Sequence, residues 1–316
     1  MVTLNQNVWV GYDHIAGARR TEEKQKFEIW FDRPSRIQSL RDASINAAKM
    51  VRDSMYKEIV VLYSGGMDSE WVIESFRCAG IPVTALVIVY EDGLNAHDVA
   101  YARRYCERWN INAVYKELNL RDWYKSAAQK ELAWNAQTVE LAYTTQFQAI
   151  IDMNDGNRFF ITGYDEPGMS ADDSGNERQW KLFYNERHYS VVKLFNYYGI
   201  PGVANWGRFN SELFAAYVCQ PQWQMLVANM YNPLIWNAEL VKVPMFQAAF
   251  PYMEARPKFT GFEGSLDFVV DDARKWQAEV VERIGYKWDQ EWSQDIKNVW
   301  QKLGLEMRNV SRTING

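Results

Sequence analysis

The chain has 316 residues, of which 47% are hydrophobic and 24% are charged, a balance typical of globular proteins. Its net charge of −5 disfavours broad nucleic-acid binding, which needs a basic surface. Three widely spaced cysteines argue against a disulfide framework and form no Cys-x-x-Cys metal site. The N-terminus shows no signal-peptide pattern and the apolar runs are too short to span a bilayer, so we expect a cytoplasmic protein without a membrane partner.

Residues 1–54 are interpreted as an N-terminal segment. Weak alternation of apolar residues over 27–31 indicates a short strand, and the apolar spacing over 39–56 indicates a helix. Nothing in this segment carries a recognisable chemical motif.

Residues 55–170 alternate between strand and helix patterns. The predicted strands are 58–63, 83–90, 113–118 and 158–162. Between them we predict helices at 68–79 and 96–109, the second capped by Asn95, and a helical region over 120–153. This order predicts an α/β fold, with a parallel sheet and helices on both of its faces.

Residues 171–316 are predicted to be a helical region that selects the substrate. A polar stretch at 167–179, rich in Gly, Asp and Ser, is predicted to be a loop at its start. Two amphipathic helices are predicted near the end, at 266–284 and 288–303, ended by Gly285 and Gly304.

One motif follows the first strand of the predicted sheet, and it reads Ser64, Gly65, Gly66, Met67, Asp68, Ser69. The next helix points its N-terminus at the carboxyl edge of the sheet, where its free N–H groups favour an anion. Glycines let the backbone approach a ligand, and the two serines offer hydroxyl groups to phosphate oxygens. Because Asp68 would repel bare phosphate, it points to a bridging Mg²⁺. The alternative is a tight turn with Asp and Ser as helix caps.

The segment 62–69 resembles the signature of the N-type, or PP-loop, ATP pyrophosphatases. The resemblance covers about residues 58–166 and implies an adenine nucleotide α-hydrolase-like fold. It further implies cleavage of ATP between the α- and β-phosphates, adenylation of a substrate and release of pyrophosphate. Adenine recognition by strand ends in this superfamily would fall on Leu62 and Val89.

A second match begins at Gly163, where Gly-Tyr-Asp-Glu follows the fourth strand and resembles the Gly-Ser-Asp-Glu element of asparagine synthetase-like domains. The resemblance implies that Asp165 holds magnesium together with Asp68. The alternative is a surface turn.

Charge that develops at the α-phosphate needs cationic partners, and we select Lys181 and Lys193 as catalytic candidates. Further candidates are Arg178, Arg187, Arg256 and Lys258. The alternative for each of these side chains alone is a solvated surface charge, which is the more frequent role of such residues.

The chain lacks several features that occur in members of the PP-loop superfamily. Residue 2 is Val2 rather than a Cys nucleophile, and no cysteine zinc or iron–sulfur pattern occurs. The sequence therefore predicts an AMP-forming ligase that uses ATP, Mg²⁺, a small-molecule acceptor and an amine or ammonia. The alternatives are a non-catalytic adenine-nucleotide-binding module and an RNA-modifying adenylase, the latter disfavoured by the acidic composition. The oligomeric state stays open, a homo-oligomer included.

Overall fold

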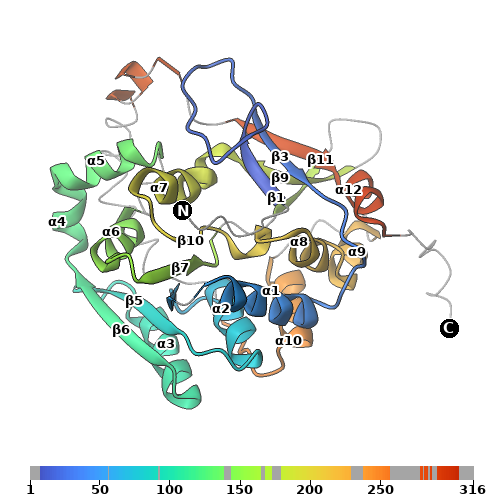
Figure 1. The fold of residues 1–316 in the computed structure, drawn as a ribbon, viewed down its shortest axis with the longest axis horizontal. Coiled ribbons are helices and arrows are strands. Elements are labelled where there is room, and N and C mark those ends of the chain that lie inside the picture. The colour runs from blue at the N-terminus through green and yellow to red at the C-terminus, as the bar shows by residue number, and fades with distance from the viewer. Residues whose placement is uncertain are drawn as a thin grey trace.

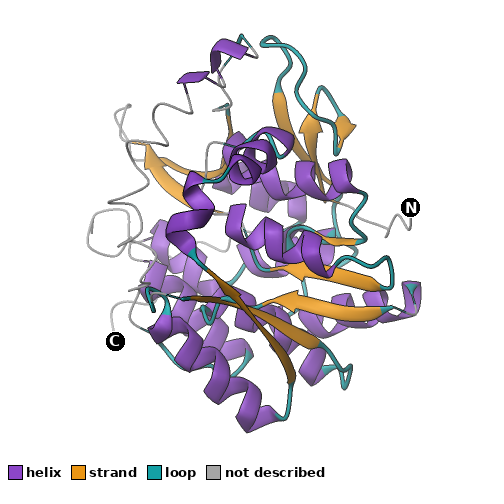
Figure 2. Cartoon of the chain, turned by 90° about the vertical axis from the view of Figure 1, so that its left-hand side faces the viewer, coloured by secondary structure: helices purple, strands orange, loops and turns teal. Residues whose placement is uncertain are grey.

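A computed structural model describes residues 8–55, 57–91, 93–138, 144–164, 168–172, 179–228, 238–256, 278–279, 281–283, 285–286 and 290–305. Its centre is a five-stranded parallel sheet in the order β10-β7-β4-β5-β6 (Figures 1 and 2). The strands are β4 (Glu58–Leu62), β5 (Thr84–Tyr90), β6 (Asn112–Leu118), β7 (Arg158–Thr162) and β10 (Gly202–Val203). The α/β class and all four predicted strands are confirmed.

The sheet is covered on both faces, because neighbouring residues of each strand point to opposite sides. Along β4, Ile59 and Val61 belong to one core, and Val60 and Leu62 to the other. The first core contains α1 (Leu40–Ser54), α2 (Met67–Cys78) and α3 (Ala96–Trp109). The second contains α4 (Leu120–Lys125), α5 (Ala127–Asn135), α6 (Thr144–Met153) and α7 (Ser190–Tyr198), which lie on the opposite side in Figure 1.

Two three-stranded antiparallel sheets lie beyond the parallel sheet, in the upper part of Figure 1. One is formed by β1 (Val8–Tyr12), β2 (Ile15–Ala16) and β3 (Phe27–Phe31). The other is formed by β8 (Gly168–Asp172), β9 (Gln179–Asn185) and β11 (Glu291–Asp295). The strand predicted at 27–31 is confirmed, whereas β1 gave no recognised signal.

The second antiparallel sheet corrects two predictions. The loop predicted at 167–179 is wrong for 168–172, because that stretch pairs with β9. The helix predicted at 288–303 is wrong for 291–295, which forms β11 beside β9; only α12 (Ile296–Leu303) is helical, and it ends at Gly304 as predicted. The pairing of segments distant in sequence overrides the local helical pattern. The helix predicted at 266–284 lies largely outside the described residues.

The remaining helices are α8 (Ser211–Val218), α9 (Pro221–Ala228) and α10 (Ala238–Ala249), with short 3-10 turns η2 (Glu186–Tyr189) and η3 (Trp206–Arg208). Asn95 is the N-cap residue of α3 as predicted, but its side chain makes no capping hydrogen bond and instead bridges the Tyr90 N–H and the Ile88 carbonyl of β5. None of the described helices is long and apolar enough to cross a bilayer.

The chain order of the sheet creates one distinctive edge. From β4 the chain proceeds to β5 and β6 on one side, then returns to place β7 on the other side of β4. At such a switch point the connections after β4 and β7 leave in opposite directions, and the crevice at their carboxyl ends is where open α/β sheets bind ligands. The loop 64–66 and Gly163 follow β4 and β7 at this edge.

Candidate functional site

The segment 64–69 forms a compact loop that opens helix α2 and is partly exposed to solvent. Ser64 is exposed, whereas the Ser69 side chain is turned inward. The Ser69 hydroxyl donates to the Gly66 carbonyl at 3.0 Å and accepts from the Ser64 N–H at 3.2 Å. The two serine hydroxyls lie 3.1 Å apart. Ser69 thus holds the bend together from inside, while Ser64 faces outward.

The N-terminus of α2 has no side-chain cap. Gly66 is the N-cap residue and has no side chain with which to cap the helix, and its own N–H donates to the Ser64 hydroxyl at 3.2 Å. The alternative interpretation, in which Asp68 and Ser69 serve as caps, is therefore wrong: Ser69 bonds backward to the bend. First-turn N–H groups that lack a capping side chain suit an anionic ligand, which the helix dipole also favours.

Two glycines are required by close backbone approaches. Gly65 has φ +88°, and a Cβ there would lie 2.2 Å from the carbonyl oxygen of Asp98 in α3. A Cβ at Gly163 would lie 2.6 Å from the carbonyl oxygen of Asp68. The turn after β7 thus packs directly on the first turn of α2, so the structure brings Gly163 and the 64–69 loop together as predicted.

Asp68 meets a lysine that the sequence analysis did not single out. The Lys242 ammonium group of α10 lies 2.8 Å from Oδ1 and 2.9 Å from Oδ2 of Asp68. The Asp68 side chain is 32% exposed and that of Lys242 16%, so the pair is partly buried yet open to solvent. The 174 residues between them leave no local pattern by which the sequence could have revealed the contact.

Arg256, one of the candidate cations, reaches the same loop from the stretch after α10. Its guanidinium donates to the Gly65 carbonyl and forms an ion pair with Glu70, which also accepts from Tyr63 at 2.7 Å. Glu70 is fully buried. Burial raises the pKa of Glu70, and the Arg256 guanidinium opposes that rise. Arg256 therefore compensates a buried carboxylate and also fixes the bend of the loop.

An aromatic contact holds α10 against α2. Phe246, one turn after Lys242, packs on Trp71 with ring centroids 5.4 Å apart, and Trp71 also stacks on Tyr217 of α8. Asp68 lies three residues before Trp71. Residues three or four apart share a helix face. The aromatic contact and the ion pair therefore lie next to each other in the interface between α10 and α2.

The other predicted site residues are distributed as follows. Leu62 is buried at the end of β4, and Val89 is half-buried near the end of β5; both lie at the carboxyl edge of the sheet. Lys181 is half-buried on β9, opposite Ser170 and Asp295. Asp165, Arg178 and Lys258 lie outside the described residues.

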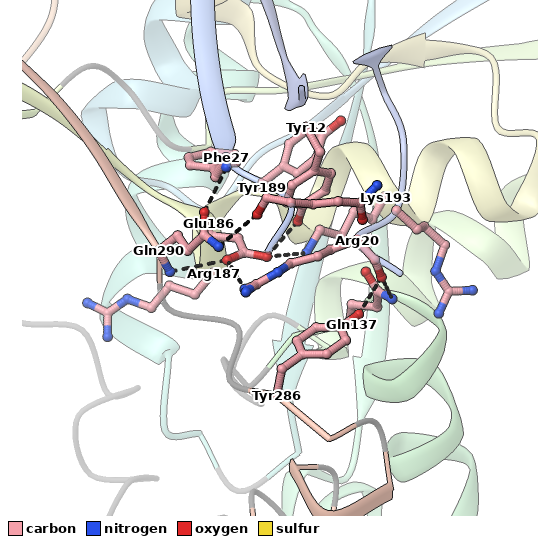
Figure 3. A network of polar contacts seen from close by, with 12 residues as sticks. Tyr12, Arg20, Phe27, Gln137, Glu186, Arg187, Tyr189, Lys193, Tyr286 and Gln290 are labelled. Atoms are coloured by element: carbon pink, nitrogen blue, oxygen red, sulfur yellow. Dashed lines mark hydrogen bonds and ion pairs between the residues drawn. The ribbon is translucent and has the colours of Figure 1, made fainter. Parts of the chain in front are cut away.

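Lys193 lies in a second polar cluster, centred on Glu186 (Figure 3). We call it the Glu186 cluster, and it comprises Tyr12, Arg20, Glu186, Lys193 and Gln290. Glu186 accepts from Tyr12 at 2.7 Å, from Arg20 at 3.0 Å and from the Gln290 N–H at 3.1 Å, and the Lys193 ammonium is 3.8 Å away. The side chains of Lys193 and Glu186 are both 0% exposed. The contacts described for Lys193 thus belong to this cluster and do not include the 64–69 loop.

The residues at the loop are compatible with magnesium held jointly with a nucleotide. Within the described part of the chain, no group of three or more His, Cys, Asp or Glu side chains could hold a metal by itself. Magnesium is usually bound through one or two carboxylates together with substrate phosphates. Asp68, beside an uncapped helix N-terminus, fits that pattern.

The fold is thus an α/β fold with a five-stranded parallel sheet and helices on both faces. Among solved structures the chain is similar to NMN synthetase from Francisella tularensis, with a TM-score of 0.35 and 14% sequence identity over 76% of this chain and 96% of that chain. No protein-family model and no curated protein matches the chain. At this TM-score the likeness does not by itself define the function of the chain.

Proposed function

We propose that the chain binds ATP at Ser64–Ser69 and acts as an AMP-forming ligase of the PP-loop ATP pyrophosphatase type. The observation that carries the proposal is the exposed, uncapped loop at the β4–β7 switch point. The resemblance of 62–69 to the PP-loop signature supports it, because the residues of that signature occupy the edge where such a ligand would lie.

Each part of the loop has a task in this proposal. The N–H groups of the first turn of α2 receive phosphate oxygens, and the Ser64 hydroxyl faces the same side. Asp68 would hold Mg²⁺, with Asp165 as the proposed second carboxylate. Bound there, the ion would supply positive charge to the leaving pyrophosphate. Arg256 keeps the Gly65 peptide in place by donating a hydrogen bond to the Gly65 carbonyl.

The reaction would proceed in two steps. An acceptor oxygen attacks the α-phosphorus of ATP, and the bond from that phosphorus to the bridging oxygen breaks, so that pyrophosphate leaves. An amine or ammonia then attacks the adenylated acceptor, loses a proton and displaces AMP. Positioning and fixed charges would supply most of the acceleration. Lys181 remains a proposed partner of the α-phosphate.

Product analysis tests this proposal. The protein is incubated with ATP labelled at the α-phosphate, with Mg²⁺, ammonium and a panel of small carboxylic acids. We expect labelled AMP, with pyrophosphate in equal amount, for at least one acceptor. Labelled ADP as the sole product would contradict α–β cleavage. ATP binding without turnover across a broad panel would favour a nucleotide-binding module instead.

A further inference from the structure

We propose that Lys242 competes with the divalent cation for the carboxylate of Asp68, so that metal enters this site with the nucleotide rather than alone. This inference rests on the proposed function, because it concerns the metal that would accompany ATP. Lys242 would thus be a positioning residue that sets the order of binding.

The geometry places the ammonium group where a metal would have to bind. Lys242 Nζ donates a hydrogen bond to Oδ2 of Asp68 at 2.9 Å and lies 2.8 Å from Oδ1, so the ammonium group stands against both carboxylate oxygens. Magnesium binds oxygen at about 2.0–2.1 Å and takes an octahedral shell. A cation bound to either oxygen at that distance would stand against the ammonium group, and two positive charges would share one carboxylate.

The surroundings keep Lys242 in that place. The Phe246–Trp71 contact, one turn further along both helices, fixes the register of α10 on α2. The Lys242 side chain is only 16% exposed, so water screens the pair less than it screens a surface ion pair.

The next carboxylate along α2 offers the metal no alternative. Glu70 is fully buried, and its charge is already compensated by Arg256. The Asp68–Lys242 pair carries no net charge, so this pair by itself attracts a divalent ion less than a lone carboxylate would. The phosphates of ATP change this balance, since they supply negative charge to both the metal and the displaced ammonium group.

The test measures the binding of Mn²⁺ alone, by electron paramagnetic resonance of the free ion, to the full chain without nucleotide. Lys242→Gln should bind Mn²⁺ at least about 10-fold more tightly than the unaltered chain, because one like charge is removed at contact distance. Lys242→Arg, which keeps the charge, should bind as weakly as the unaltered chain. The double variant Lys242→Gln/Asp68→Asn should lose the gain.

A matched control is Lys116→Gln, which removes the same charge from the ion pair with Asp152 on another part of the surface. It should leave Mn²⁺ affinity unchanged. Equal Mn²⁺ affinity in Lys242→Gln and the unaltered chain would overturn the inference. Lys242→Met provides a second removal of the charge if the Gln variant does not fold, and circular dichroism verifies folding of each variant.

The outcome is separable from that of the proposed function. If AMP and pyrophosphate are formed but Lys242→Gln gains no Mn²⁺ affinity, the proposed function stands and the competition is wrong. If Lys242→Gln gains affinity through Asp68 while no nucleotide binds, the competition stands and the proposed function is wrong.

Discussion

Two lysine–carboxylate contacts in this molecule look alike in chemistry and differ in their surroundings. Asp68 and Lys242 meet at 2.8 Å in a partly exposed position, beside an uncapped helix N-terminus. Glu186 and Lys193 lie 3.8 Å apart with both side chains at 0% exposure. The Glu186 carboxylate also accepts hydrogen bonds from Tyr12, Arg20 and the Gln290 N–H. A ligand could exchange with the first pair, whereas the second is enclosed by protein.

The difference shows why residue type alone does not identify a catalytic lysine. Glu186 links β1, α7 and the segment before β11 through Tyr12, Lys193 and Gln290. The charge of its carboxylate therefore stabilises the packing of these three segments. Among the contacts described for Asp68 is the ion pair with Lys242, which comes from α10. We therefore expect changes at Glu186 to affect stability and changes at Asp68 to affect chemistry.

The largest expected effect is on stability, from Glu186→Gln. This change leaves the buried Arg20 guanidinium without the charge of the Glu186 carboxylate, which costs about 3–5 kcal/mol in the free energy of unfolding. Urea denaturation followed by tryptophan fluorescence measures it. Asp68→Asn is the matched control, and its unfolding midpoint should stay close to that of the unaltered chain. A midpoint for Glu186→Gln equal to that of the control would show that the buried cluster is not structural.

Asp68→Asn should lower the activity and leave the stability nearly unchanged. Loss of the carboxylate removes the proposed metal ligand and should lower pyrophosphate release about 100- to 1,000-fold, as for other lost electrostatic contacts in active sites. The coupled pyrophosphate assay is the measurement, with Glu186→Gln assayed at a temperature where it remains folded. Full activity of Asp68→Asn would remove Asp68 from the site.

A smaller effect is expected from Gly65→Ala, which tests whether ATP binding depends on the backbone bend of the loop. An added Cβ meets the Asp98 carbonyl at a positive φ, so the bend must shift and ATP affinity should fall about 10-fold. Gly80→Ala is the control, because Gly80 also has a positive φ, +71°, but lies outside the loop, and its Cβ would meet no atom within 4 Å. Calorimetry of ATP binding should separate the two variants; equal affinities would count against this loop as the nucleotide site.

The last expected effect concerns the pH dependence of stability and belongs to the Glu186 cluster. Burial lowers the pKa of Lys193 from its ordinary value of 10.5 to about 7, although the Glu186 carboxylate opposes this. From pH 7 to 10.5 the unfolded chain then holds more protons than the folded chain, so this lysine makes stability increase with pH. Lys193→Met should remove that contribution, up to about 1.4 kcal/mol per pH unit. Urea unfolding at pH 7, 8 and 9 measures the slopes, and identical slopes would contradict it.

The sequence predicted the parts of the fold that depend on local patterns. The continuous apolar run at 59–63 and the glycines after it sufficed to predict β4, the bend and the start of α2. By contrast, β8 and β11 are strands only because β9 lies between them, a pairing that no local pattern reveals. The same limit applies to Lys242, whose contact with Asp68 is created by the packing of α10 on α2. For Lys193 the missing information was burial, which depends in part on Tyr12 from a distant segment.

The most direct test of the nucleotide site is hydrogen–deuterium exchange of the whole chain with and without Mg²⁺ and ATP. Bound phosphates should slow exchange in the peptide that spans Gly65–Ser69, while the peptide that contains Glu186 and Lys193 should not change. Unchanged exchange at Gly65–Ser69 under saturating ATP, or protection confined to the Glu186 cluster, would contradict the assignment.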